Sequence, residues 1–274
     1  VCIAARCWFS LVSHARAWGG VRWFGLVALL AGGLLSPAQA ALYAEYHFEE
    51  SSYNGTAGQV RDTSGNGRHA RTVGLASSSA SGRSGRGLLI ADNTTSTTAA
   101  LDTGIDINDL GAAGTISFWF RSTASGDGWK ILYDASTSTS AKFYLVREGD
   151  VGTDGIEAGI TLGTSLRKVY DANGIDDTQW SHVTVTWSAT GMRAYVKNAD
   201  CSTRYDESLA VTGLVNVNTG TLYIGDNRST AVDGETHTDL ASANGTFDVV
   251  RIYDHAQTPT EVSANCANAA SLHH

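Results

Sequence analysis

Residues 42–74 of the chain read LYAEYHFEESSYNGTAGQVRDTSGNGRHARTVG. Residues 42–48 alternate between apolar and polar side chains, as a half-buried β-strand does. The run 62–67, DTSGNG, predicts a tight turn, because Asp, Asn and Gly tolerate the backbone conformations that turns require. A second short strand is expected at 71–74. The stretch therefore predicts a strand, a polar excursion and another strand.

The sequence after residue 74 continues with short apolar runs between turn residues. In residues 180–187, Val183, Val185 and Trp187 share one face of the predicted strand, and a Thr190-Gly191 turn leads into its hairpin partner. Strands are predicted at 88–91, 99–101, 115–121, 129–134, 142–147, 156–162, 180–187, 192–197, 221–224 and 247–253. This pattern indicates an all-β fold, a two-sheet antiparallel jelly-roll sandwich.

Two segments of the chain depart from the strand pattern. Residues 76–87, ASSSASGRSGRG, contain no core-forming side chain and are expected to be a flexible loop. Residues 258–261, TPTE, combine a cap, a proline at the first helical position and a glutamate at the third, which is a capping box. We expect one short C-terminal helix from Pro259 to about Asn265.

The first 40 residues predict a secretory signal peptide. An apolar run at 23–35 follows Arg22, and Ala38-Gln39-Ala40 places small residues where a signal peptidase reads, so cleavage is expected after Ala40. The alternative is a membrane anchor, but the run is shorter than the ~20 residues that a span needs. The sequence thus predicts a leader at 1–40, one secreted sandwich domain at 41–267 and a tail at 268–274, with no membrane insertion after cleavage.

Charge narrows the class of partner. The chain has 19 basic and 27 acidic residues, for a net charge of −8, and the leader contributes three arginines and no acid. An acidic surface argues against binding nucleic acid or anionic membranes. It is compatible with cations and with neutral glycans.

Cysteine usage fits an exported protein. Cys2 and Cys7 lie in the leader, so only Cys201 and Cys266 remain in the predicted domain. Two cysteines in an exported chain are expected to form a disulfide. The alternative is a pair of free buried thiols.

Four motifs occur in order along the chain. They are NGTAGQVRDTSGNGRH at 54–69, TISFWF at 115–120, WSHVTVTW at 180–187 and FDVVRIYD at 247–254. Together they resemble a laminin-G-like domain of the concanavalin A-like lectin/glucanase type, over residues 42–266. The first motif is particularly similar to the domain in MSHA pilus biogenesis proteins of the MshQ type and in other bacterial surface proteins. The resemblance implies a jelly roll at a bacterial surface.

This sequence departs from the family pattern in its loops. Ala70 follows the histidine of the first motif, where the family often has glycine, and ADCSTRYDES is inserted after Asn198. The loop 226–245 is long and acidic. These differences leave the choice of ligand open.

The turn at 62–67 is a candidate calcium site. Ca²⁺ takes six to eight oxygen ligands at ~2.3–2.6 Å, and Asp62, Asn66 and nearby carbonyls could supply several. In laminin-G-like relatives the first and last strands lie side by side, so Asp248 is expected to complete a structural calcium site, with Glu45 or Glu49 as further candidates. The alternative is that Asp62 and Asn66 only bind their own backbone.

Two loops are candidate ligand-binding regions. Trp129 follows a Gly-Asp-Gly run at a loop edge, and sugar binders stack sugar rings on exposed aromatic side chains. Asp226, Asp233 and Glu235 form an acidic run that could hold a second cation, although such a run is more often a solvated loop. Trp119 and Trp187 lie in apolar strands and are expected to be core residues.

No catalytic motif is found in the sequence. The paired carboxylates that retaining glycosidases require do not occur as an E-x-D-x-E strand, and there is no Gly-x-Ser-x-Gly or His-Glu-x-x-His motif. We therefore predict a secreted, non-catalytic recognition or adhesion domain that binds a glycan or an extracellular protein, in association with a pilus. The alternatives are a structural building block of an extracellular assembly and, less favoured, a glucanase-type hydrolase.

Overall fold

The computed structural model describes residues 41–91, 99–123, 128–138, 140–150, 153–162, 165–171, 174–175, 178–210, 220–225 and 241–271. Contacts divide the chain into two units, Val1–Pro37 and Ala38–His274, and all the described residues lie in the second. The predicted leader therefore lies outside the described residues. Among those residues, no helix is long and apolar enough to cross a membrane.

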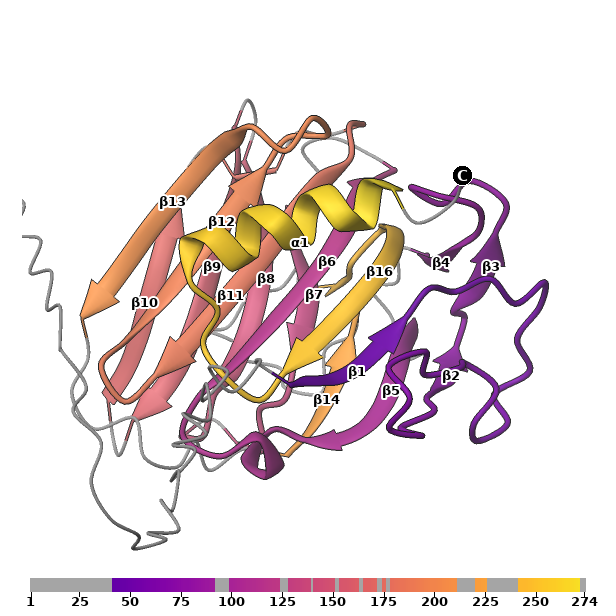
Figure 1. Ribbon diagram of the computed structural model, residues 1–274, viewed down its shortest axis with the longest axis horizontal. Coiled ribbons are helices and arrows are strands. Elements are labelled where there is room, and N and C mark those ends of the chain that lie inside the picture. Colours follow the sequence, from indigo (N-terminus) through magenta and orange to yellow (C-terminus); the bar gives the residue numbers. More distant parts are fainter. Residues whose placement is uncertain are drawn as a thin grey trace, which may run out of the picture. The chain divides into compact units, whose positions relative to one another are not determined.

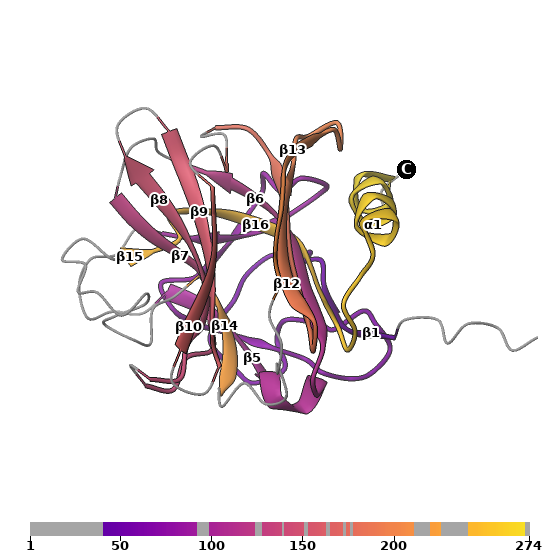
Figure 2. The same ribbon diagram turned by 90° about the vertical axis from the view of Figure 1, so that its left-hand side faces the viewer.

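The second unit is built from two sheets of eight strands each, which face each other in Figure 2. The first sheet has the order β13-β12-β11-β6-β16-β4-β3, with β1 also paired to β16. Its strands are β1 (Leu42–Tyr46), β3 (Ser77–Ser79), β4 (Gly87–Ile90), β6 (Gly114–Ser122), β11 (Ser181–Ser188), β12 (Gly191–Lys197), β13 (Thr203–Ala210) and β16 (Gly245–Tyr253).

The second sheet has the order β10-β9-β8-β7-β14-β5-β2, with β15 also paired to β7. Its strands are β2 (Arg71–Gly74), β5 (Ala99–Asp106), β7 (Gly128–Asp134), β8 (Phe143–Asp150), β9 (Thr153–Leu162), β10 (Ser165–Asp171), β14 (Thr221–Ile224) and β15 (Ala241–Ser242). All pairs are antiparallel except β15 with β7. A 3-10 helix, η1 (Ile107–Leu110), follows β5, and the helix α1 (Pro259–Ser271) ends the described chain. The predicted two-sheet jelly roll is confirmed (Figure 1).

The core lies between the sheets and is filled by every second residue of their strands. Val183, Val185 and Trp187 of β11 all point into it, as their alternation predicts. The Trp187 ring meets the Phe143 ring of the opposite sheet edge to face, with centroids 5.0 Å apart. Gly114 makes room for this contact, because a Cβ there would lie 2.2 Å from the Trp187 ring.

Helix α1 lies on the face of the first sheet that points away from the core (Figure 2). It begins at Pro259 as predicted, and the capping box is present: Glu261 accepts from the Thr258 N–H at 2.7 Å, and the Thr258 hydroxyl accepts from the Glu261 N–H at 3.3 Å. The helix runs to Ser271, beyond the end expected near Asn265 and beyond the predicted domain end at 267. Near the expected end, Asn265 bonds to Arg251 and Ser117 of the sheet and Cys266 bonds to Cys201, so this part of the helix is held in place.

The expectation of a flexible loop at 76–87 is wrong. Ser77–Ser79 forms β3 against β4, and the Ser84 N–H donates to Asp248 at 2.9 Å. Strand pairing and side-chain hydrogen bonds from Ser78 and Arg86 to the Glu50 carbonyl order this segment, and Ala76 packs into the core. Three further strands were not predicted, namely β10, β13 and β15. β10 and β13 lie at sheet edges, no residue of β13 is fully buried, and β15 has only two residues.

The predicted disulfide between Cys201 and Cys266 is present. It ties α1 to the turn between β12 and β13. The bridge packs with Trp119 and Trp180 in a small cluster outside the main core, so Trp119 is buried by the helix rather than between the sheets. The Arg121 guanidinium lies 4.9 Å from the centroid of the Trp180 ring.

We expect replacement of Cys201 and Cys266 by serine to lower the free energy of unfolding by about 4 kcal/mol, because the bridge closes a long loop in the unfolded chain. Urea unfolding of the variant and the oxidised protein measures this difference. Trp fluorescence provides a second readout, since a disulfide quenches adjacent indoles and its reduction should raise emission. Equal midpoints in both proteins would contradict the expectation.

Candidate functional site

The carboxylate of Asp62 is fully engaged by the backbone. One oxygen accepts from the N–H groups of Glu45 at 3.0 Å and Ser64 at 2.9 Å, and the other accepts from the N–H of Arg68 at 2.8 Å. Burial raises the pKa of Asp62, but hydrogen bonds from Ser64, Glu45 and Arg68 outweigh this effect and hold the pKa below its usual range. The contacts with Ser64 and Arg68 match the alternative in which the turn binds its own backbone, and the contact with Glu45 joins the turn to β1.

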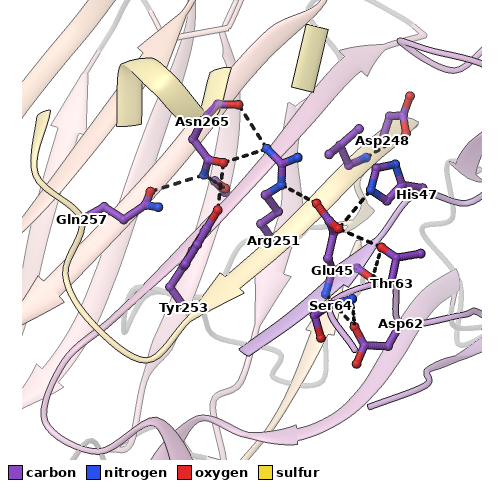
Figure 3. A network of polar contacts seen from close by, with 12 residues as sticks. Glu45, His47, Asp62, Thr63, Ser64, Asp248, Arg251, Tyr253, Gln257 and Asn265 are labelled. Carbon is purple, nitrogen blue, oxygen red and sulfur yellow. Dashed lines mark hydrogen bonds and ion pairs between the residues drawn. The ribbon is translucent and has the colours of Figure 1, made fainter. Parts of the chain in front are cut away.

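The other two predicted calcium ligands point elsewhere. The Asn66 side-chain amide donates to the carbonyl of Leu42 at 2.8 Å. The Asp248 carboxylate accepts from the N–H groups of Ser84 at 2.9 Å and Val249 at 2.8 Å. β1 pairs with β16 at residues 250–253, so Asp248 lies past the end of β1, and Figure 3 shows it well away from Asp62.

Asp62, Asn66 and Asp248 thus do not converge on one point. Within the described part of the chain, no group of three or more His, Cys, Asp or Glu side chains could hold a metal ion. The described residues therefore do not fit a calcium cage at this turn, and a structural calcium stays a prediction.

The turn instead belongs to a polar network that joins the first strand, the last strand and the helix (Figure 3). Glu45 of β1 accepts from the Arg251 Nε at 2.6 Å, and its other oxygen accepts from the Thr63 hydroxyl at 2.9 Å. The Arg251 guanidinium also donates to the Asn265 side chain of α1 at 2.7 Å. Burial raises the pKa of Glu45, but His47 and Arg251 lower it to about 2. Arg251 therefore holds both ends of the domain together.

We expect Arg251→Met to cost about 3–5 kcal/mol of stability, because it leaves the Glu45 carboxylate buried without its cation. The double variant with Glu45→Gln should recover a substantial part of the loss, since it removes the uncompensated charge. Urea unfolding of the wild type, both single variants and the double variant gives the coupling. A double variant as unstable as the sum of the singles would contradict this account.

Two buried groups of the first sheet, His182 and Asp248, have shifted pKa values. The two shifts change the stability of the fold in opposite directions as pH rises. Burial, together with Arg251 and Lys197, lowers the pKa of His182 to about 3. Burial raises the pKa of Asp248 to about 7, against hydrogen bonds from Ser84, Val249 and Arg83. His182 therefore adds stability that is lost as pH falls below about 6.5. Asp248 adds stability that is lost as pH rises from about 4 to about 7.

The contributions of His182 and Asp248 to the pH dependence of stability oppose each other. The contribution of Asp248 is therefore measured as the difference in free energy of unfolding between a variant and the wild type. We expect the stability of Asp248→Asn, relative to wild type, to rise as pH increases from about 4 to about 7, by up to about 1.4 kcal/mol per pH unit. Urea unfolding across this range gives the two profiles. Parallel profiles would show that Asp248 does not titrate there.

The outer face of the second sheet, which points away from the core, carries a different set of side chains. Phe143 and Leu145 of β8 are core residues, so the alternating residues Tyr144 and Val146 point outward. Strand register aligns the outward residues in two rows across the sheet. These rows are Lys168–Gly159–Tyr144–Asp134–Tyr223 and Tyr170–Glu157–Val146–Ile131.

A hydrogen-bonded trio lies at the β10 end of these rows. The Tyr144 hydroxyl donates to Glu157 at 2.6 Å, and the Lys168 ammonium lies 3.2 Å from the same oxygen. The Tyr144 ring lies over Gly159, where a Cβ would come within 2.3 Å of it. Glycine at 159 therefore lets the ring lie flat on the sheet and fixes the position of the trio.

Trp129 is the one sequence-predicted ligand residue that the structure describes. It is half-buried and packs with Leu166 against the buried cluster Ile131, Tyr144 and Val146. Asp226, Asp233 and Glu235 lie outside the described residues. We call the outward set the aromatic face, and its members are Trp129, Ile131, Tyr144, Val146, Glu157, Leu166, Lys168, Tyr170 and Tyr223.

Sequence reasoning missed Glu157 and Lys168. Lys168 lies on β10, which was not predicted. Glu157 was within a predicted strand, and its alternation with the core residues Ile156 and Ala158 was the signal that it points outward. Nothing in the sequence distinguishes Tyr144 and Tyr170 from the other tyrosines of the chain.

Comparison with known proteins identifies the class. The profile of the concanavalin A-like lectin/glucanases superfamily, in its laminin-G form, matches residues 92–263. This match covers more than half of the chain, which therefore belongs to that superfamily. The finer similarity to pilus biogenesis proteins stays a prediction, and no curated protein matches the chain.

Solved structures show the same fold at low sequence identity. Domain 4 of AbnA, a GH43 extracellular arabinanase from Geobacillus stearothermophilus in complex with arabinotriose, has a TM-score of 0.55 at 15% identity, over 83% of this chain and 98% of that one. The binding domain of botulinum neurotoxin DC, in complex with rat synaptotagmin II, has a TM-score of 0.55 at 12% identity, over 80% of this chain. This chain spans 51% of the neurotoxin domain. At these identities the likeness shows the fold alone.

Proposed function

We propose that the protein is an extracellular, non-catalytic recognition domain that binds a glycan on the aromatic face. The observation that carries the proposal is the trio of Tyr144, Glu157 and Lys168, which presents a fixed ammonium beside half-buried aromatic rings. Sugars offer a C–H face for stacking and hydroxyls for hydrogen bonds, so they need both kinds of group. Export by the predicted leader agrees with this role.

The exposed members of the aromatic face are the direct contacts in this proposal. Tyr170 has 48% of its surface exposed, and Trp129, Leu166, Lys168 and Tyr223 are partly exposed. Tyr144 and Glu157 are buried and act by positioning Lys168. The bound arabinotriose of the AbnA domain supports a carbohydrate as the ligand for a domain of this fold.

We expect Trp129→Ala to weaken binding of the best glycan about tenfold, equivalent to about 1.4 kcal/mol, because it removes a stacking surface. A glycan array identifies the ligand and isothermal titration calorimetry gives the affinities. Trp180→Ala is the matched control, because Trp180 is a half-buried tryptophan on the other sheet. It should bind as the wild type does.

Three outcomes would overturn the proposal. Absence of binding across the array would favour a structural role in an extracellular assembly. Equal weakening by both tryptophan variants would place the site elsewhere. Release of reducing ends from a bound glycan would replace recognition with hydrolysis.

A further inference from the structure

A groove of about 310 Å³ lies on the outer face of the first sheet, beside the segment that joins β16 to α1. Its volume is near the lower end of small-molecule sites, about 300 Å³. Hydroxyl, guanidinium and amide groups line one part of it, and small apolar side chains line the rest. The main lining residues are Thr186, Arg193, Ser208, Ala210, Gln257 and Pro259.

The floor of the groove is a regular row across three strands. Thr186 of β11 pairs with Arg193 of β12, which pairs with Ser208 of β13. Alternation places all three on the outer face, because the neighbouring residues Val185 and Ala194 belong to the core. Strand pairing therefore presents two hydroxyls with a guanidinium between them.

Arg193 is held rigidly in this floor. Its Nε donates to Asp206 at 2.6 Å and its Nη2 donates to the other Asp206 oxygen at 2.8 Å. The guanidinium also lies 5.0 Å from the centroid of the Tyr195 ring. Asp206 pairs with the Nε and Nη2 groups of Arg193. The Nη1 group therefore remains as a hydrogen-bond donor whose direction is already fixed.

The charge balance indicates which ligand suits the groove. Asp206 neutralises Arg193, so the site offers donors and acceptors without a net charge to attract an anion. Ala210, Ala256 and Pro259 add small apolar surfaces beside the polar row. A ligand with hydroxyls on one edge and C–H groups on one face, which is the chemistry of a sugar ring, complements both parts.

We propose that this groove is a second carbohydrate site, which binds one or two rings of a neutral sugar independently of the aromatic face. The two sites lie on opposite sheets. The domain would then hold two glycan segments at once.

The test is an NMR titration of isotope-labelled protein with cellotriose, mannotriose and arabinotriose, and with trigalacturonate as an anionic probe. At least one neutral trisaccharide should shift the amides of Arg193, Ser208 and Gln257 together. Ser208→Trp fills the groove and should raise the dissociation constant at least tenfold. Ser165→Trp is the matched control, because Ser165 is an exposed serine on the other sheet, and it should leave these shifts unchanged.

Arg193→Lys provides a second variant that does not fill space. It keeps the charge but loses the planar fork, so it should weaken binding as well. Trp129→Ala should leave the groove shifts intact, so failure of the aromatic-face proposal is distinguishable from failure of this one. Groove amides that none of the three neutral trisaccharides shifts at millimolar concentration, or that only trigalacturonate shifts, would overturn the proposal.

Discussion

The buried guanidinium of Arg251 is the contact on which the closed sandwich depends. It joins Glu45 near the start of the domain to Asn265 in the helix at its end, while its own strand lies in the middle of the first sheet. A buried cation is tolerated only when its hydrogen bonds are satisfied, so strand, turn and helix must all be in place together. The turn at 62–67 joins the same network, because the Thr63 hydroxyl donates to Glu45.

The location of this network also explains the different character of the two sheets. The helix and the disulfide cover much of the outer face of the first sheet, which is polar and carries Ser117, His182 and Arg251. The outer face of the second sheet has no helix among the described residues. Its rings and charged groups are organised by strand register alone, and this difference leads us to place recognition there.

Much of the fold could be predicted because it depends on local pattern. Alternation in 180–187 identified the core face of β11, and the TPTE run located the start of α1. The helix length could not be predicted in the same way, because Asn265 and Cys266 are stabilised by residues far away in sequence. β13 was missed because only Tyr205 and Leu209 of this edge strand pack against the core, and two apolar residues four positions apart do not identify a strand. The candidate site was harder, since the register of three strands, β8, β9 and β10, brings Tyr144, Glu157 and Lys168 together, and no spacing in the sequence encodes that register.

The disulfide has a consequence for the fate of the domain outside a cell. Cys201 and Cys266 are 65 positions apart in the sequence. The segment between them includes β13, β14 and the final strand β16. If a protease cuts one peptide bond anywhere in this span, both fragments stay covalently joined and remain in their sheets. A nicked molecule would keep its architecture, and damage would become visible only when the bridge is reduced.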